Sequence, residues 1–196
     1  MVSLTKKERE AILILFKDFT SYYNANSISK ILNISHVGAQ KMLKRFMNED
    51  LVISKTIGKS IIFKLNLDNN YVLNLIIFLL ADEANKYKRW KEEFKELYKG
   101  DRIIMMFGSA IKNYAYAHDI DIMIVMGNKE IKEVNEIIKK KENILPKKLQ
   151  TIKLTPEDLL ENIKKRDIVV LDIIKNAIIL YGHEKYVEIL KNVPRF

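Results

Sequence analysis

The 196-residue chain has no cysteine, only three prolines and only six glycines. Without cysteine it has neither disulfides nor a thiolate metal site, a composition that fits a reducing compartment. Its longest apolar run, residues 75–81, is much shorter than the about 20 residues that cross a membrane. Residues 1–10 are polar and charged, which is not the pattern of a signal peptide. We therefore expect a cytoplasmic protein with no membrane partner.

Apolar and basic side chains are abundant instead. Hydrophobic residues make up 48% of the chain, enough for a core without covalent cross-links, and the length allows one large or two small domains. The formal net charge of +9 favours a polyanionic partner. Residues 1–68 hold 11 Lys and Arg against 6 Asp and Glu, a net charge of +5, so the N-terminal third carries more than half of the excess.

Residues 1–68 have the pattern of three helices followed by a β-hairpin. Apolar residues at helical spacing predict the first helix, Asn26 or Ser27 can cap a short second helix, and Ser35 can cap a third. Two β-like runs follow, with Gly58 in the turn between them. This order resembles a winged helix-turn-helix, and the resemblance implies that the third helix enters the major groove of double-stranded DNA.

The third helix and the hairpin supply the predicted DNA contacts. A recognition helix needs an apolar inner face and a polar, basic outer face. Gln can read adenine and Arg or Lys can read guanine, whereas lysines of the wing hold phosphates. The predicted inner face consists of Val37, Met42, Leu43, Phe46 and Met47. The predicted DNA-binding residues are Ser35, His36, Gln40, Lys41, Lys44 and Arg45 on the helix and Lys55, Lys59 and Lys64 on the hairpin. Winged helices also serve as protein–protein modules, which is the alternative.

Residues 69–99 are predicted to form one long helix that links two domains. The first half of this helix is too apolar to face water on all sides, whereas the second half is charged. We expect the apolar half to form a homodimer contact. Packing against the chain's own domains is the alternative.

The segment from residue 105 to residue 126 indicates nucleotide chemistry. An apolar run enters a bend at Gly108-Ser109, and a second apolar run carries Asp119 and Asp121. Residues i and i+2 of a strand point to the same side, so these carboxylates, about 6–7 Å apart along the strand, can share a hard divalent cation. Free backbone N–H groups where a strand passes into a helix favour phosphate. The sequence thus predicts a metal-binding acid pair beside a phosphate cradle.

This pattern resembles a family signature. Gly108-Ser109, nine intervening residues and the Asp119–Asp121 pair are similar to the signature of minimal nucleotidyltransferases of the DNA polymerase β superfamily. Lys112 matches a basic residue that is usual three positions after the Ser. Asn113 and His118 stand where a Gly and a Ser are common, and the spacing is one residue shorter than usual.

The resemblance implies both an activity and its residues. The implied reaction is transfer of a nucleotidyl group to an unknown hydroxyl acceptor, with Mg²⁺ or Mn²⁺ as the cofactor and a nucleoside triphosphate, which we expect to be ATP. The implied catalytic and metal-binding residues are Asp119 and Asp121. The implied nucleotide-binding residues are Gly108, Ser109 and Lys112.

A third carboxylate, usual on the next strand in this family, is missing here. Residues 147–154 contain no acid, and Gln150 is the best match for that position. A Gln oxygen can coordinate a cation, but it brings no charge and cannot act as a general base. The alternative is therefore a transcriptional regulator whose degenerate nucleotidyltransferase domain senses nucleotide or mediates assembly. An antitoxin-like module that pairs with a helical partner is a further possibility.

The remaining pattern completes the expected fold. It predicts a helix over residues 129–141, a strand over 149–154, a helix that begins at Thr155-Pro156, and an apolar helix over 168–181 that ends at Gly182. The predicted fold class is α+β, with a mixed sheet and covering helices in the C-terminal domain. The expected domains are a winged helix-turn-helix over residues 1–68, a linking helix over 69–99 and a nucleotidyltransferase-like domain over 100–196.

Overall fold

The computed structural model describes residues 3–193. The described chain divides into two compact units, residues 3–79 and 80–193, and helix α4 (Asn70–Asn85) runs through the division. Both helices and sheets are present, so the predicted α+β class is confirmed. Within the described range, no helix is both long and apolar enough to cross a lipid bilayer.

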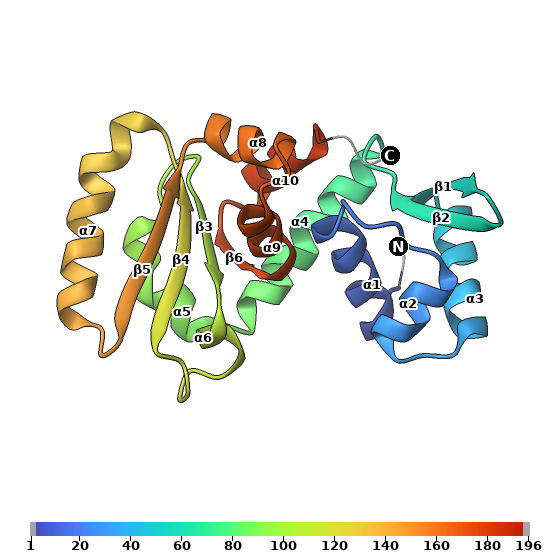
Figure 1. Ribbon diagram of the computed structural model, residues 1–196, viewed down its shortest axis with the longest axis horizontal. Helices are drawn as coiled ribbons and strands as arrows, with labels where there is room; N and C mark the ends of the chain where they lie inside the picture. The colour runs from blue at the N-terminus through green and yellow to red at the C-terminus, as the bar shows by residue number, and fades with distance from the viewer. Residues whose placement is uncertain (1–2, 194–196) are drawn as a thin grey trace. The chain divides into compact units, whose positions relative to one another are not determined.

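The first unit is a winged-helix fold, as predicted. Its three helices precede an antiparallel hairpin (Figure 1). Tyr23, which lies between α1 and α2, pairs with Phe63 of the hairpin in an isolated antiparallel β-bridge. Buried apolar residues from all three helices and both strands share one core. The elements are α1 (Lys6–Lys17), α2 (Ala25–Leu32), α3 (His36–Asn48), β1 (Val52–Ile57) and β2 (Ser60–Leu65).

Two details of the first unit differ from the sequence prediction. The N-cap of α2 is Asn24, not Asn26 or Ser27, because Asn24 and Ser27 form a reciprocal capping box. The inner face of α3 excludes Val37 and Met47, whose side chains are 57% and 44% exposed. The buried residues of α3 are Ala39, Met42, Leu43 and Phe46.

The predicted single helix over residues 69–99 is interrupted. Helix α4 ends at Asn85, a turn at Lys86 and Tyr87 follows, and the chain continues as α5 (Lys88–Glu93) and the 3-10 turn η1 (Lys95–Leu97). After the interruption, the aromatic and apolar side chains of α5, of η1 and of the residue between them are buried in the core of the second unit. Those side chains are Trp90, Phe94 and Leu97.

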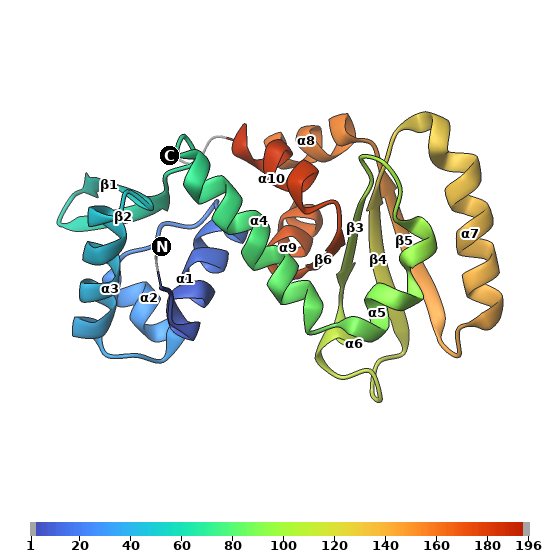
Figure 2. The same cartoon turned by 180° about the vertical axis from the view of Figure 1, so that it is seen from behind.

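The second unit is built on a four-stranded mixed sheet with the order β5-β4-β3-β6. Strands β4 and β5 are parallel, and β3 is antiparallel to both β4 and β6. Figure 2 shows α5 in front of one face of the sheet, whereas in Figure 1 it lies behind, so α5 covers that face. The strands are β3 (Ile103–Phe107), β4 (Asp119–Val125), β5 (Lys148–Leu154) and β6 (Ile178–Tyr181). The other elements are α6 (Ser109–Lys112), η2 (Asn128–Glu130), α7 (Ile131–Ile144), α8 (Pro156–Lys164), α9 (Ile168–Asn176) and α10 (His183–Lys191).

The predicted helix over residues 168–181 is wrong in its second half. Helix α9 ends at Asn176, and residues 178–181 form β6, which pairs with β3 at the edge of the sheet. Gly182 then opens α10 instead of closing a helix. A Cβ on Gly182 would lie 3.0 Å from the Cα of Ile103, so only glycine allows this close approach of β6 to β3.

The central strand β4 separates apolar from acidic side chains. Ile120, Ile122 and Ile124 are fully buried in one core cluster with Trp90 of α5 and with Phe94, the residue that follows α5. Successive side chains of a strand alternate between faces, so the two aspartates of β4 lie on the opposite face of the sheet. The acids are thus the first and third residues of a strand whose other residues are buried.

Candidate active site

Asp119 and Asp121 are the first and third residues of β4, and both are half-buried. Their side chains share a face of the sheet because they are two residues apart in one strand. The structure therefore brings together the acid pair that the sequence pattern predicts.

Gly108 forms the bend between β3 and α6, and its backbone lies directly against Asp121. Its φ of 76° belongs to the left-handed region that favours glycine. A Cβ at this position would fall 2.9 Å from the Cγ of Asp121 and closer still to one carboxylate oxygen. Phe107, the residue before the bend, pairs with Asp121 in the sheet. The glycine-led bend and the acid pair thus form one continuous site.

Ser109 and Lys112 lie at the two ends of the short helix α6, and both are exposed. Helix α6 packs on β3 and β4, so both residues are held at the edge of the sheet where β4 begins. His118, the residue before the first aspartate, is also exposed.

Gln150 occupies the place beside the acids on the neighbouring strand. In the parallel pair of β4 and β5 it lies in register with Asp121. Its side-chain amide nitrogen donates a hydrogen bond to Oδ2 of Asp119. The residue that matches the missing third carboxylate is therefore in contact with the acid pair.

The acid pair has the chemistry of a cation site. Burial raises the pKa of Asp121 above its ordinary value, and the neighbouring charge of Asp119 raises it further. Two carboxylates and an amide oxygen are hard ligands, and a divalent cation between them would relieve the like-charge repulsion. Residues 3–193 contain no cluster of three or more His, Asp or Glu side chains suited to a metal. The residues fit one cation held by two carboxylates, with only an amide as a third group.

Lys147 fixes the loop that leads into the acid pair, a role that the sequence pattern did not reveal. Its ammonium donates to the carbonyl oxygens of Tyr114 at 2.5 Å, Ala115 at 3.2 Å and Ala117 at 2.5 Å. No local motif predicts these bonds, because Lys147 is 30 residues away from Ala117 in the sequence. The three hydrogen bonds that this ammonium donates hold the loop against the start of β5.

The predicted DNA-binding residues lie mostly at the surface of the first unit. The exposed ones on α3 and its N-cap are Ser35, His36, Gln40, Lys41 and Lys44. Lys55 and Lys59 are exposed on the hairpin. These seven side chains supply polar and basic groups on the third helix and the wing.

Arg45 and Lys64 instead make contacts within the unit. Arg45 pairs with Glu8 at 2.8 Å and with Glu49 at 2.9 Å, which ties α3 to the start of α1. Lys64 is only 1% exposed and donates to the carbonyl oxygen of Phe19 at 2.6 Å. The expectation that Lys64 offers its charge to phosphate is therefore wrong, because its ammonium is buried inside the N-terminal unit and donates to a backbone carbonyl oxygen there.

A mixed sheet whose central strand begins with two acids, facing a glycine-led bend from the preceding strand, defines a nucleotidyltransferase-like domain. Residues 87–181 match the family model described as "Nucleotidyltransferase domain". The C-terminal part of the chain thus contains a nucleotidyltransferase domain, and the resemblance seen in the sequence is confirmed. Such domains generally use a nucleoside triphosphate and a divalent metal.

Comparisons of the whole chain give weaker similarities. None of the curated proteins matches it. Among solved structures it is similar to the adhesin competence repressor (AdcR) from Streptococcus pyogenes, at 12% identity, 74% coverage of this chain, 84% of that chain and a TM-score of 0.38. It is also similar to a mutant of Lactococcus lactis ZitR, at 13% identity, 74% and 78% coverage and a TM-score of 0.35. These TM-scores are too low to support an argument, so the winged-helix assignment depends on the element order and the hairpin of the first unit.

Proposed function

We propose that the C-terminal domain binds a nucleoside triphosphate, ATP in the first instance, together with Mg²⁺ or Mn²⁺. In this proposal it transfers a nucleotidyl group to the hydroxyl of a still unknown acceptor, and pyrophosphate leaves. The observation that carries the proposal is the contact between Gly108 and Asp121, which joins a phosphate cradle to a half-buried acid pair.

Each residue of the site has a distinct part in this proposal. The backbone at Gly108 and Ser109 cradles the β- and γ-phosphates, and Lys112 adds positive charge. Asp119 and Asp121 hold the cation, which when bound neutralises the triphosphate and lowers the pKa of the attacking hydroxyl. The hydrogen bond from Gln150 orients the Asp119 carboxylate.

The second candidate function is a regulator whose nucleotidyltransferase domain binds nucleotide without turnover. Strand β5 contains no acid, and its Gln150 cannot accept a proton from the acceptor. A site with two carboxylates and one amide can still bind a nucleotide with its cation. This candidate keeps the same binding residues and differs only in the chemical step.

Incubation with α-labelled ATP, Mg²⁺ or Mn²⁺ and candidate acceptors separates the two functions. Incorporation that disappears in the Asp119→Asn, Asp121→Asn double variant supports the enzyme. Glu157→Gln is the matched control, because Glu157 is an exposed acid of the same domain outside the pair. Nucleotide binding that needs both aspartates, without incorporation, supports the regulator. Binding that is unchanged in the double variant contradicts both.

The N-terminal domain is proposed to bind double-stranded DNA through α3 and the wing. The supporting observation is the exposed set of polar and basic residues on these two elements. Lys41→Glu with Lys44→Glu should abolish a mobility shift, whereas Lys30→Glu on α2 removes the same type of exposed charge outside this face. Binding should also weaken steeply with salt, because phosphate contacts release counterions. A shift that is insensitive to salt, or that survives the double variant, contradicts the proposed face.

A homodimer through α4 is also proposed. Tyr71 and Phe78 on this helix are 44% and 57% exposed. Two large exposed apolar side chains on one helix could pack against the same helix of a second copy of the chain. Light scattering at micromolar concentration should give twice the mass of 23.0 kDa. A monomeric mass contradicts this part of the proposal.

A further inference from the structure

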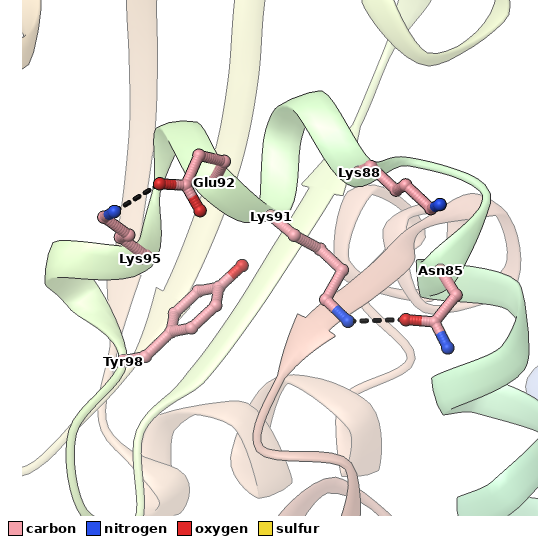
Figure 3. Close-up of a pocket in the computed structure, with 6 residues that line it drawn as sticks. All are labelled: Asn85, Lys88, Lys91, Glu92, Lys95 and Tyr98. Atoms are coloured by element: carbon pink, nitrogen blue, oxygen red, sulfur yellow. Dashed lines mark hydrogen bonds and ion pairs between the residues drawn. The ribbon is translucent and has the colours of Figure 1, made fainter.

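A small basic pocket lies on α5, outside the acid pair and its bend. Figure 3 shows six residues around it, drawn from the end of α4, from α5 and from the segment that follows. The cavity has a volume of about 270 Å³. The lining residues are Asn85, Lys88, Lys91, Glu92, Lys95 and Tyr98. None of them belongs to the site around Asp119 and Asp121.

The lining is rich in hydrogen-bond donors and positive charge. It contains three lysines and one glutamate. Glu92 already pairs with Lys95, and the side-chain oxygen of Asn85 accepts a hydrogen bond from Lys91 at 2.7 Å. The carboxylate and the amide oxygen are therefore engaged, whereas the lysines retain further N–H donors. An incoming ligand meets donors and a surplus of positive charge.

The hydroxyl of Tyr98 is a fixed donor in the wall of this pocket. It is buried and has no hydrogen-bond partner among the described residues. Figure 3 shows it turned toward the helix that carries Lys91 and Glu92. The Tyr98 ring stacks on Tyr181, with 4.8 Å between centroids and 8° between planes. Burial raises the pKa of Tyr98, and the Glu92 charge adds to this, so the hydroxyl keeps its proton.

An unsatisfied buried hydroxyl is costly. A ligand that supplies several acceptor oxygens offsets this cost, and its negative charge complements three lysines that face one glutamate. Phosphate has three or more acceptor oxygens and is bound well by lysines as point charges. Ligand pockets have volumes of about 300–1,000 Å³. The cavity of about 270 Å³ is at the small end of that scale, so it suits the phosphate groups of a small compound rather than a folded partner.

We propose that the pocket formed by Lys88, Lys91, Lys95 and Tyr98 binds the phosphate groups of a small phosphorylated molecule. The lysines provide charge, and the Tyr98 hydroxyl donates to a phosphate oxygen. The site is separate from the nucleotidyltransferase site, so it binds without a divalent cation and without the acid pair.

Titration calorimetry with inorganic tripolyphosphate in EDTA tests this site on the full chain. Lys88→Gln with Lys91→Gln should weaken binding about tenfold or more, because charged hydrogen bonds are lost. Tyr98→Phe keeps the stacked ring and removes only the hydroxyl, so it should weaken binding a few-fold. Lys132→Gln with Lys139→Gln on α7 removes two exposed charges of the same domain and should leave the affinity unchanged. Thermal unfolding of each variant shows whether it is folded.

Several results would overturn the proposal. If tripolyphosphate affinity falls equally in the pocket variant and the α7 variant, the attraction between charges is nonspecific. If it falls in neither, tripolyphosphate binds elsewhere. Loss in Asp119→Asn, Asp121→Asn would assign the binding to the nucleotidyltransferase site. Loss of DNA binding in the pocket variant, with unchanged tripolyphosphate affinity, would make the pocket a nucleic-acid contact. The protein could bind tripolyphosphate at this pocket and yet neither bind nor incorporate labelled ATP. That result would support the pocket and refute only the proposed function.

Discussion

The ammonium of Lys147 lies 4.5 Å from the ring centroid of Tyr114 and also donates a hydrogen bond to the Tyr114 carbonyl oxygen. The guanidinium of Arg89 approaches the same ring to 4.2 Å, and Trp90 meets it edge-on at 5.2 Å. The ring therefore ties α5, the loop after α6 and the start of β5 together. Because this loop ends at Asp119, the position of the first carboxylate depends on these contacts.

Replacing this lysine should loosen the loop. Lys147→Met removes three hydrogen bonds and a cation–π contact, which should cost about 2 kcal/mol of stability. Amide hydrogen exchange over residues 113–118 should become faster, and cation affinity at the acid pair should fall. Lys164→Met, an exposed lysine of α8, is the control and should change neither. Unchanged exchange in the loop would show that Lys147 does not hold it.

Alanine at the bend should damage the site as well as the fold. Gly108→Ala is strained at its φ of 76°, by about 1–3 kcal/mol, and its Cβ displaces the Asp121 carboxylate. Gly100→Ala shares the positive φ, 54°, but its Cβ meets no atom within 4 Å. Both variants should lose stability in urea, and only Gly108→Ala should lose Mn²⁺ and nucleotide binding in calorimetry. Equal nucleotide affinity in the two variants would contradict the close contact with Asp121.

Restoring an acid on β5 should strengthen the cation site. Gln150→Glu places a third carboxylate in register with Asp121, so Mn²⁺ affinity should rise by roughly tenfold, since ligand charge tunes affinity. Without metal the same variant should melt at a lower temperature, because three carboxylates repel one another. Gln150→Ala is the control: it removes the hydrogen bond to Asp119 without adding a charge, so it should not raise Mn²⁺ affinity. Equal Mn²⁺ affinity in wild type and Gln150→Glu would place Gln150 outside the site.

The raised pKa of Asp121 predicts how stability changes with pH. The folded state holds the Asp121 proton more tightly than the unfolded chain, so this group contributes less stability as pH rises from about 4 through the raised pKa. In EDTA, Asp121→Asn should therefore melt higher than the wild type near pH 7 and show less pH dependence. Mg²⁺ should raise the melting temperature of the wild type and not that of the variant. A wild-type melting temperature that Mg²⁺ leaves unchanged would count against a cation at the pair.

Local sequence signals were sufficient for much of the fold. Thr5 and Thr155 both form capping boxes at helix starts, each with the acid three residues further on. The acid pair and the bend are close in sequence. The two aspartates alternate with the buried Ile120 and Ile122 along β4, and this alternation sets which face of the sheet the acids take. These features depend on contacts between neighbours along the chain, which a pattern can express.

Long-range contacts explain what the sequence could not show. Residues 178–181 are apolar and continuous with α9, and only pairing with β3 makes them a strand. The tight approach at Gly182, the carbonyl cluster around Lys147 and the ion pair of Arg45 with Glu8 join residues far apart in sequence. Charge alone made Lys64 look like a DNA contact, because a single sequence cannot distinguish a solvated lysine from one that donates to backbone carbonyl oxygens of its own domain.

The buried ammonium of Lys64 donates to the carbonyl oxygens of Phe19 and Ser21. Reagents that acylate amines react with free, accessible nitrogen, so this lysine is shielded while its exposed neighbours on the wing are modified. Its labelling rate consequently reports how often the N-terminal domain opens, without any added dye or engineered residue.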